Sequence, residues 1–218
     1  MSTSTPNQPG LRDRKKAATR QTISNVATQL FVERGFEKVS IDDIARAAAV
    51  ARKTVFNYFP RKEDLVFDRE EEVREIVRQA LADRGEQAPV DAFQALMRRL
   101  LEERHSLFLI SERAAQFWRA VAASPALTTR ARELQVTLAD DLAAMLADAA
   151  GRSHADPDAS LAAAMLMDTL VVAYRDALRA FHDNREPAPA FMRVLERGFS
   201  GVNAALGDTP YSEARGKP

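Results

Sequence analysis

Residues 40–62, SIDDIARAAAVARKTVFNYFPRK, constrain the fold of this chain more than any other stretch. Ser40 and Asp43 are spaced so that each side chain can accept a hydrogen bond from the other's backbone N–H. That arrangement is a capping box with Asp in place of Glu, and it predicts a helix start. Apolar residues then recur at helical spacing, at Ile41, Ile44, Ala45 and Ala48.

The helical pattern breaks near Ala49-Val50, and a second short helix is expected to begin near Ala51. Pro60 ends it, because proline has no N–H and disfavours helical geometry in the residue before it. Two short helices joined by a tight turn form a helix-turn-helix, a DNA-binding motif. The alternative is a buried helical hairpin whose charged residues are simply solvated.

The second helix has one side for the protein core and one for a partner. Val55, Phe56 and Phe59 supply its apolar side, and we assign both phenylalanines to the core. The expected DNA contacts are polar residues on or just after this helix: Arg52, Lys53, Thr54, Asn57, Tyr58 and Lys62. Arg52 suits bidentate contact to guanine, whereas Tyr58 and Lys62 suit phosphates. Tyr58 could instead be a half-buried core ring.

The motifs Ser40-Ile-Asp-Asp-Ile-Ala, Thr54-Val-Phe-Asn-Tyr-Phe and Lys62-Glu-Asp-Leu resemble the DNA-binding domain of the TetR family of transcriptional repressors. The resemblance runs from about Lys16 to Leu65. The family usually has glycine at the position of Ala49, so we expect modest strain or a different turn there. It usually has Ser or Thr at the position of Ala51, so the second helix should lack a side-chain cap, at a cost of about 1 kcal/mol.

Charge is distributed unevenly along the chain. The net charge is zero, yet Leu11–Tyr58 holds ten basic and five acidic residues, and the remainder carries the balancing negative charge. The basic residues between Arg12 and Arg20 are expected near the DNA backbone. A basic N-terminal segment on a mildly acidic body favours a DNA-binding protein with a separate partner domain.

The composition excludes several other classes of protein. There is no cysteine, which removes disulfides, thiolate catalysis and zinc fingers. No run of eighteen apolar residues predicts a transmembrane helix, and the first ten residues lack the apolar core of a secretory signal. The three histidines are scattered and no glycine-rich loop follows a strand, so we predict no enzyme activity, metal or cofactor, and a cytoplasmic location.

The predicted fold is all-α, with about nine helices. We expect a disordered lead-in at residues 1–10, a helix-turn-helix domain at 11–61, a ligand-binding and dimerisation domain at 62–206 and a tail at 207–218. The first helix should run over Leu11–Arg34 and end at Gly35, and a single long linking helix is expected over Lys62–Arg84. Further helices are expected at 90–104, around 116–121, and at 125–150, 157–182 and 187–206, several with proline at the first turn.

The last two helices carry surplus apolar surface, and Gly198 and Gly201 would allow another helix to approach closely. Together with the small contact area of one helix-turn-helix, this predicts a homodimer through the last two helices and a palindromic DNA site. Candidate residues for an apolar ligand cavity are Phe93, Met97, Phe117, Trp118, Met145, Met167 and Tyr174, although residues of these types more often belong to an ordinary core.

The resemblance implies a repressor released from its operator by a small molecule that enters the C-terminal domain. The segment Arg52–Asp68 is also similar to a subset of the family that senses acyl-CoA-like ligands, so a small apolar or acyl-type effector is expected. The alternative from another class is a helical small-molecule-binding module that acts without DNA.

Overall fold

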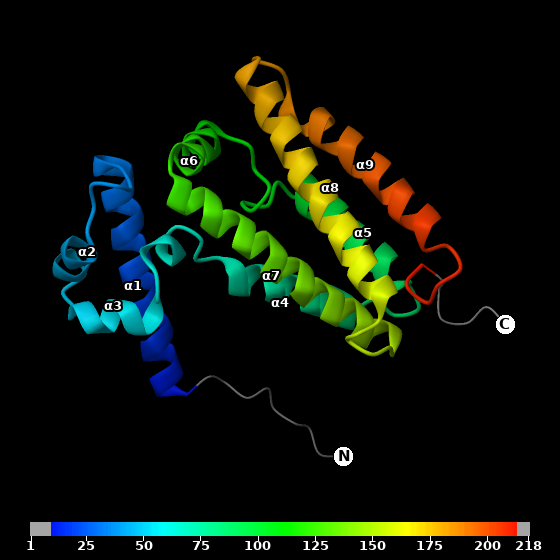
Figure 1. Cartoon of the computed structure of the whole chain (residues 1–218), viewed down its shortest axis with the longest axis horizontal. Helices are drawn as coiled ribbons and strands as arrows, with labels where there is room; N and C mark the ends of the chain where they lie inside the picture. The colour runs from blue at the N-terminus through cyan, green and yellow to red at the C-terminus, as the bar shows by residue number, and fades with distance from the viewer. Residues whose placement is uncertain (1–9, 213–218) are drawn as a thin grey trace. The chain divides into compact units, whose positions relative to one another are not determined.

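A computed structural model describes residues 10–212, and all the regular secondary structure in that range is helical (Figure 1). This confirms the predicted all-α class. The predicted lead-in, apart from Gly10, and the last six residues of the predicted tail lie outside the described residues. The elements are α1 (Leu11–Arg34), α2 (Ile41–Ala47), α3 (Arg52–Tyr58), the 3₁₀ helix η1 (Lys62–Leu65), α4 (Glu70–Ala82), α5 (Pro89–Glu102), α6 (Glu112–Ala123), α7 (Pro125–Ala150), α8 (Pro157–His182) and α9 (Pro187–Ala205).

The chain divides into two compact units. Among the described residues, the head unit comprises those up to Asp68 together with Ser124–Arg130, and the body unit comprises Arg69–Ala123 and those from Ala131 onward. No helix of the described chain is long and apolar enough to cross a membrane.

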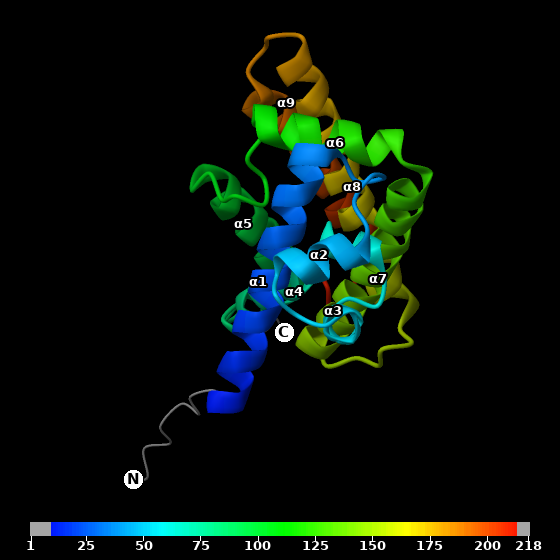
Figure 2. The ribbon, with the colours of Figure 1, turned by 90° about the vertical axis from the view of Figure 1, so that its left-hand side faces the viewer.

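The head unit is built on α1, whose buried face packs against α2 and α3 (Figure 2). Ile23 and Ala27 of α1, Ile44 of α2, Val55 of α3 and Phe59 directly after α3 are completely buried in one core. Gly35 ends α1 with φ 83°, a left-handed conformation that glycine adopts without steric cost. The predicted bounds of this helix are therefore confirmed.

The single linking helix predicted over Lys62–Arg84 is wrong. The chain instead forms η1, a turn at residues 66–69, and α4. Ser24 of α1 donates a hydrogen bond to the Asp68 carboxylate within the head unit. The next residue, Arg69, donates within the body unit to Glu72 Oε1 and Oε2, each at 2.6 Å, and to Ser106 Oγ at 2.9 Å. The interruption therefore coincides with the boundary between the two units, where Asp68 bonds within one unit and Arg69 within the other.

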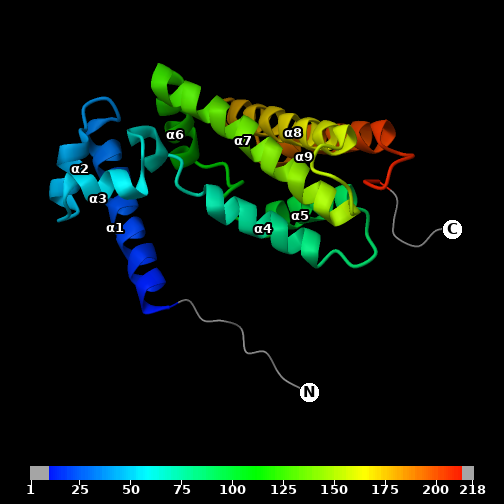
Figure 3. The same ribbon diagram turned by 60° about the horizontal axis from the view of Figure 1, so that its bottom comes forward.

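In the body unit, α8 and α9 lie side by side and are joined by a short turn (Figure 3). Gly198 of α9 makes this approach possible, because a Cβ there would lie 2.2 Å from Thr169 Cγ2 of α8. The structure thus confirms the close approach predicted from the small residue. The bounds predicted for α7 and α8 are also confirmed, with proline at the first position of each helix.

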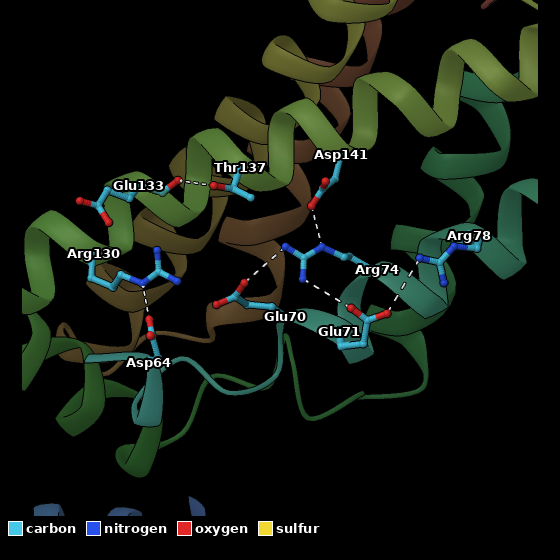
Figure 4. Close-up of polar contacts among 9 residues, drawn as sticks. All are labelled: Asp64, Glu70, Glu71, Arg74, Arg78, Arg130, Glu133, Thr137 and Asp141. Carbon is cyan, nitrogen blue, oxygen red and sulfur yellow. Dashed lines mark hydrogen bonds and ion pairs between the residues drawn. The ribbon is translucent and has the colours of Figure 1, made fainter. Parts of the chain in front are cut away.

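Polar pairs tie the other body helices together. Arg74 of α4 donates from Nε to Asp141 Oδ2 of α7 at 2.6 Å, and Glu70 and Glu71 lie at 3.3 and 3.6 Å from the same guanidinium (Figure 4). The hydrogen bond to Asp141 raises the pKa of Arg74, so the group stays charged. Arg98 of α5 makes a bidentate pair with Glu196 of α9, at 2.7 and 2.9 Å.

Part of the predicted tail belongs to the body core. Tyr211 is fully buried, its hydroxyl donates to Asp156 Oδ2 at 3.0 Å, and its carbonyl accepts from the N–H of Val90 at 3.0 Å. Asp156 also caps α8 by accepting from the N–H of Asp158. Residues 207–212 therefore connect the start of α5 with the start of α8.

Candidate nucleic-acid interface

The two-helix hairpin begins with the predicted capping box. Asp43 donates its backbone N–H to Ser40 Oγ at 3.1 Å, and Ser40 donates its N–H to Asp43 Oδ2 at 3.0 Å. The hydrogen bonds from Ser40, first from its hydroxyl and then from its N–H, lower the pKa of Asp43. The carboxylate is therefore held in its charged form beside the N-terminus of α2, where a negative charge is favourable.

The turn between α2 and α3 places Ala49 in the left-handed region, with φ 53°. A residue with a Cβ is disfavoured there by about 1–2 kcal/mol, so the strained alternative of the two predicted for Ala49 is the one that occurs. The turn is closed by a hydrogen bond from the N–H of Val50 to the carbonyl of Ala45 at 3.0 Å. Ala51 is the N-cap of α3 and makes no side-chain cap, as predicted.

The helix α3 presents one polar face. Arg52, Lys53 and Asn57 are exposed, and Thr54 and Tyr58 are half-buried at its edges. The structure therefore brings together five of the six residues predicted to contact DNA. Whether they contact DNA stays a prediction.

Phe56 also lies on this face, so its assignment to the core is wrong. Its side chain is 39% exposed, and the Arg52 guanidinium lies 5.6 Å from the centroid of its ring. Val55 and Phe59 are buried because they are four residues apart and share one side of the helix, whereas Phe56 points about 100° away. Strict helical spacing in the sequence would have identified it.

Arg52 is not a free cation in this structure. Its Nη1 lies 3.1 Å from Asp42 Oδ2 of α2, and both side chains are more than half exposed. Exposed pairs of this kind contribute about 0–1 kcal/mol, so a nucleic acid could displace Asp42 at little cost. The pair orients the guanidinium before any ligand binds.

Lys62 does not join the polar face of α3. Its Nζ donates to the carbonyl of Phe36 at 2.6 Å and lies 4.1 Å from the centroid of the Phe36 ring. Desolvation by the surrounding protein lowers the pKa of Lys62. This lysine ties η1 to the α1–α2 connection, and its predicted phosphate contact stays a prediction.

The segment Ser124–Arg130 supports the hairpin from within the head unit. Ser124 Oγ donates to Glu37 Oε1 at 2.6 Å, and Arg130 Nε lies 2.7 Å from Asp64 Oδ1 of η1 (Figure 4). Ser124 also accepts from the N–H of Leu127 at 3.4 Å, which confirms it as the cap of α7. No local sequence signal predicts the pairs with Glu37 and Asp64, because the partners are far apart in the chain.

The candidate ligand residues fall into two groups in the body unit. Phe117 and Trp118 of α6 and Tyr174 of α8 form successive ring contacts, with centroids 5.3 and 5.8 Å apart. Phe93 and Met97 are buried in the body core, against which Met145 and Met167 pack. Tyr174 links the two groups, because its ring also lies 6.4 Å from that of Phe191 in the core. Burial raises the pKa of Tyr174, so its hydroxyl stays neutral.

Among the described residues, no group of three or more His, Cys, Asp or Glu side chains could hold a metal ion.

Comparison with known proteins identifies the hairpin region. Residues 23–68 match the family described as bacterial regulatory proteins, tetR family. A putative mycofactocin biosynthesis transcriptional regulator, MftR of Mycobacterium tuberculosis, is 51% identical over 49 residues, which are 22% of this chain and 25% of the relative. The HTH-type transcriptional regulator TcmR of Streptomyces glaucescens is 37% identical over 102 residues, 44% of this chain and 45% of the relative. The chain thus spans from a quarter to under half the length of these curated relatives.

A solved structure extends the similarity to the body. FadR of Thermus thermophilus, a TetR-family transcriptional repressor in complex with lauroyl-CoA, is 28% identical, with a TM-score of 0.51. The match covers 84% of this chain and 94% of that protein.

Proposed function

We propose that this chain, which belongs to the TetR family of bacterial regulatory proteins, is a ligand-responsive DNA-binding repressor that acts as a homodimer on a palindromic operator. One observation carries the proposal: the capped hairpin buries Val55 and Phe59 and leaves Arg52, Lys53 and Asn57 exposed on the outer face of α3. A helix with a narrow polar face and an anchored apolar face suits the major groove.

The roles of the exposed residues follow from their chemistry. Arg52 would leave Asp42 and contact guanine through its two-pronged guanidinium, while Thr54 would touch a thymine methyl or a phosphate. Tyr58 and Lys53 would hold phosphates and set the position of α3 without specifying sequence.

Dimerisation is proposed through α8 and α9. Leu161 and Val172 are eleven residues apart on α8, which places them on the same side of the helix, and they are 46% and 51% exposed. A second copy covering this face would pair two head units, as a two-fold operator requires. Val172→Glu should therefore yield a monomer in analytical ultracentrifugation and lose tight binding to the operator.

The proposed effector is a small apolar or acyl-type molecule that binds in the body unit. Support comes from the aromatic contacts around Trp118 and Tyr174, and from the acyl-CoA complex of the FadR relative. Such a ligand must bind more tightly to the conformation that does not bind DNA. Equal affinity for the two conformations would leave the equilibrium between them unchanged. Lauroyl-CoA should quench Trp118, the only tryptophan, and weaken DNA binding. If neither changes, the effector class is wrong.

The decisive experiment measures DNA affinity against salt concentration. The wild-type chain would first be used to select its preferred duplex from a pool of DNA duplexes whose central 30 base pairs are random. The logarithm of its affinity should then fall steeply with the logarithm of the salt concentration, because bound phosphates release counterions. A flat dependence would favour the alternative, a helical small-molecule-binding module that acts without DNA.

Arg52→Ala tests the recognition role separately. We expect lost discrimination at one base pair per half-site, worth about 1–3 kcal/mol. A uniform loss on all sequences would instead make Arg52 a phosphate contact.

A further inference from the structure

Phe56 is an apolar side chain on an otherwise polar face. Its ring is 39% exposed, whereas its chain neighbour Val55 is fully buried. Among the head-unit side chains that the structure describes, Val32 of α1, at 75%, is the other exposed large apolar group. A single exposed apolar residue is common on protein surfaces, so the meaning of Phe56 depends on what lies beside it.

The position of Phe56 around α3 places it among the polar residues proposed to contact DNA. An α-helix turns by about 100° per residue, which puts Phe56 about 40° from Arg52 and about 60° from Lys53. Both of these basic residues are exposed. The ring therefore lies between two cations on the outer face of α3, where a DNA-binding helix meets the edges of the bases.

Arg52 and Phe56 contact each other and form a pair. The Arg52 guanidinium lies 5.6 Å from the centroid of the Phe56 ring, within the range of a cation–π contact. Its Nη1 also donates a hydrogen bond to Asp42 Oδ2 of α2 at 3.1 Å. An acid and an aromatic ring thus position the guanidinium before DNA binds. When Arg52 leaves Asp42 for a guanine, Phe56 remains its neighbour one helical turn away.

The spacing within this pair determines which bases it can reach. Successive bases along one DNA strand are about 3.4 Å apart. A guanidinium in the plane of one guanine therefore leaves the ring at the edge of a base one or two positions away. In the major groove, the apolar group by which the four bases differ is the C5-methyl of thymine. The other distinguishing groups there are hydrogen-bond donors and acceptors, which a phenyl ring cannot satisfy.

We propose that Phe56 determines specificity by packing against the C5-methyl group of a pyrimidine one or two positions from the guanine contacted by Arg52. The inference rests on the proposed DNA-binding function and names part of the sequence that α3 reads. The ring would supply apolar contact and the guanidinium would supply hydrogen bonds, so the pair would recognise two neighbouring bases together. Thymine carries this methyl group, and so does 5-methylcytosine.

Phe56 would contribute to specificity and not to general affinity for DNA. A phenyl ring has no charge and no hydrogen-bond donor for phosphates, which provide the sequence-independent part of the affinity. Thr54 lies about 160° from Phe56 around α3 and is half-buried, so it would not reach the same methyl group. A cytosine or a uracil at this position would leave the ring without its apolar partner.

The test removes the methyl group from the DNA without changing base pairing. In the duplex selected by the wild-type chain, each thymine of the half-site is replaced in turn by deoxyuracil, at the same position in both half-sites. At one thymine the replacement should weaken wild-type binding by about fourfold per half-site, the value expected when one methyl group loses its apolar contact. This thymine should lie one or two positions from the guanine whose recognition Arg52→Ala abolishes.

Methylated cytosine provides an independent measurement of the same contact. With a C·G pair at the sensitive position, 5-methylcytosine should bind the wild-type chain about fourfold more tightly per half-site than cytosine does. Equal affinities would contradict recognition of the methyl group.

Phe56→Ala separates the methyl contact from other effects of the base. This variant should bind the thymine and deoxyuracil duplexes equally, and both more weakly than the wild type binds the thymine duplex. Its affinity for a random duplex of the same length should match that of the wild type, because the phosphate contacts are unchanged.

Two further variants serve as matched controls. Phe56→Met keeps a long apolar side chain and should keep most of the discrimination between thymine and deoxyuracil. Val32→Ala shortens the other exposed apolar side chain of the head unit and should change none of these affinities. A Phe56→Met chain that discriminates no better than Phe56→Ala would rule out an apolar contact.

The outcomes separate this inference from the proposed function. A wild-type chain that selects no duplex and shows no salt-dependent binding would remove both. A selected duplex with a steep salt dependence, on which no deoxyuracil replacement weakens binding, would overturn the role of Phe56 alone. Equal losses of Phe56→Ala on selected and random duplexes would also overturn it, because they indicate impaired folding or a contact that reads no sequence. A sensitive thymine more than two positions from the Arg52 guanine, or an Arg52→Ala variant that identifies no guanine, would contradict joint recognition by the pair.

Discussion

In the head unit, α2 and α3 are seven residues each, and their ends are determined by neighbouring residues: a capping box at Ser40, a strained turn at Ala49 and an uncapped start at Ala51. In the body unit, α8 and α9 have 26 and 19 residues, and contacts distant in sequence determine how they pack. Gly198 against Thr169 and Arg74 with Asp141 are examples. Substitutions at helix ends should therefore change the stability of the head unit by small amounts. Substitutions at contacts between distant residues should destabilise the body unit more strongly.

The largest effect is expected from Gly198→Ala. The added Cβ would lie 2.2 Å from Thr169 Cγ2 and 2.8 Å from its Cβ, so α8 and α9 must separate. We expect a loss of up to about 3 kcal/mol in the free energy of unfolding. Urea denaturation followed by Trp118 fluorescence measures the body unit selectively.

Gly201→Ala is the matched control for Gly198→Ala. A Cβ at Gly201 would have no neighbour within 4 Å, so the change should be neutral or stabilising by up to about 1 kcal/mol. Equal losses in both variants would show that helix packing is not the cause.

Asp141→Ala should cost about 2 kcal/mol. It removes the closest partner of Arg74, whose side chain is 20% exposed, and leaves the guanidinium with Glu70 and Glu71. Arg78→Ala, which breaks an exposed pair with Glu75 on the same helix, should cost no more than about 0.5 kcal/mol. Both are measured by the Trp118 transition, and a reversed order would contradict the role given to Asp141.

Tyr211→Phe should cost about 1–2 kcal/mol at neutral pH by removing the hydrogen bond to Asp156. Burial, with the bond to Asp156, raises the pKa of Tyr211 to about 12, above the ordinary value near 10. The neutral phenol is therefore favoured in the folded chain, and its contribution is lost as the pH rises from 10 to 12.

The pH dependence distinguishes Tyr211 from other groups. Unfolding free energies of the wild type and of Tyr211→Phe should converge between pH 10 and 12. Parallel curves over that window would mean that another group causes the loss of stability.

Ala51→Ser should stabilise the head unit by about 1 kcal/mol, because the hydroxyl can accept from an unsatisfied N–H in the first turn of α3. Hydrogen exchange of the α3 amides measures this without interference from the body. Ala47→Ser, inside α2 and without a cap to form, should instead be slightly destabilising. No slowing of exchange in Ala51→Ser would mean that the helix start is already satisfied.

The smallest effect is expected from Ala49→Gly. Relief of the left-handed strain at φ 53° exceeds the added chain entropy of glycine by about 0.5 kcal/mol, so the hairpin should gain stability. The same substitution two residues earlier, Ala47→Gly, should cost about 1 kcal/mol because α2 is right-handed there. Slower hydrogen exchange of the hairpin amides in Ala49→Gly and faster exchange in Ala47→Gly would verify the turn geometry.

The sequence was informative wherever a local signal exists. The bounds of α1, α7 and α8 follow from Gly35, Pro125 and Pro157, since glycine and proline restrict or permit backbone angles independently of the fold. The capping box at Ser40 and the missing cap at Ala51 were predicted for the same reason.

The sequence was less informative where a side chain contacts residues that are distant in the chain. Lys62 was predicted to contact a phosphate, and no local pattern indicated that it donates to the carbonyl of Phe36, 26 residues earlier. The linking helix was expected to be continuous, although the three glutamates Glu70–Glu72 are typical of a first helical turn and could have indicated a start there. No local pattern, however, reveals that Ser24 bonds Asp68 across 44 positions.

The amino-acid sequence by itself determined the helix class, the helix ends marked by glycine, proline or a capping box, and the hairpin of residues 40–62, because backbone preferences and capping act within a few residues. Only the tertiary structure decided which charges remain available at the surface. It paired Arg52 with Asp42, turned Lys62 inward and left Arg12, Lys15 and Lys16 beside Tyr58. Electrostatic partners are fixed by distances of a few ångströms in space, and those distances arise only when the helices pack.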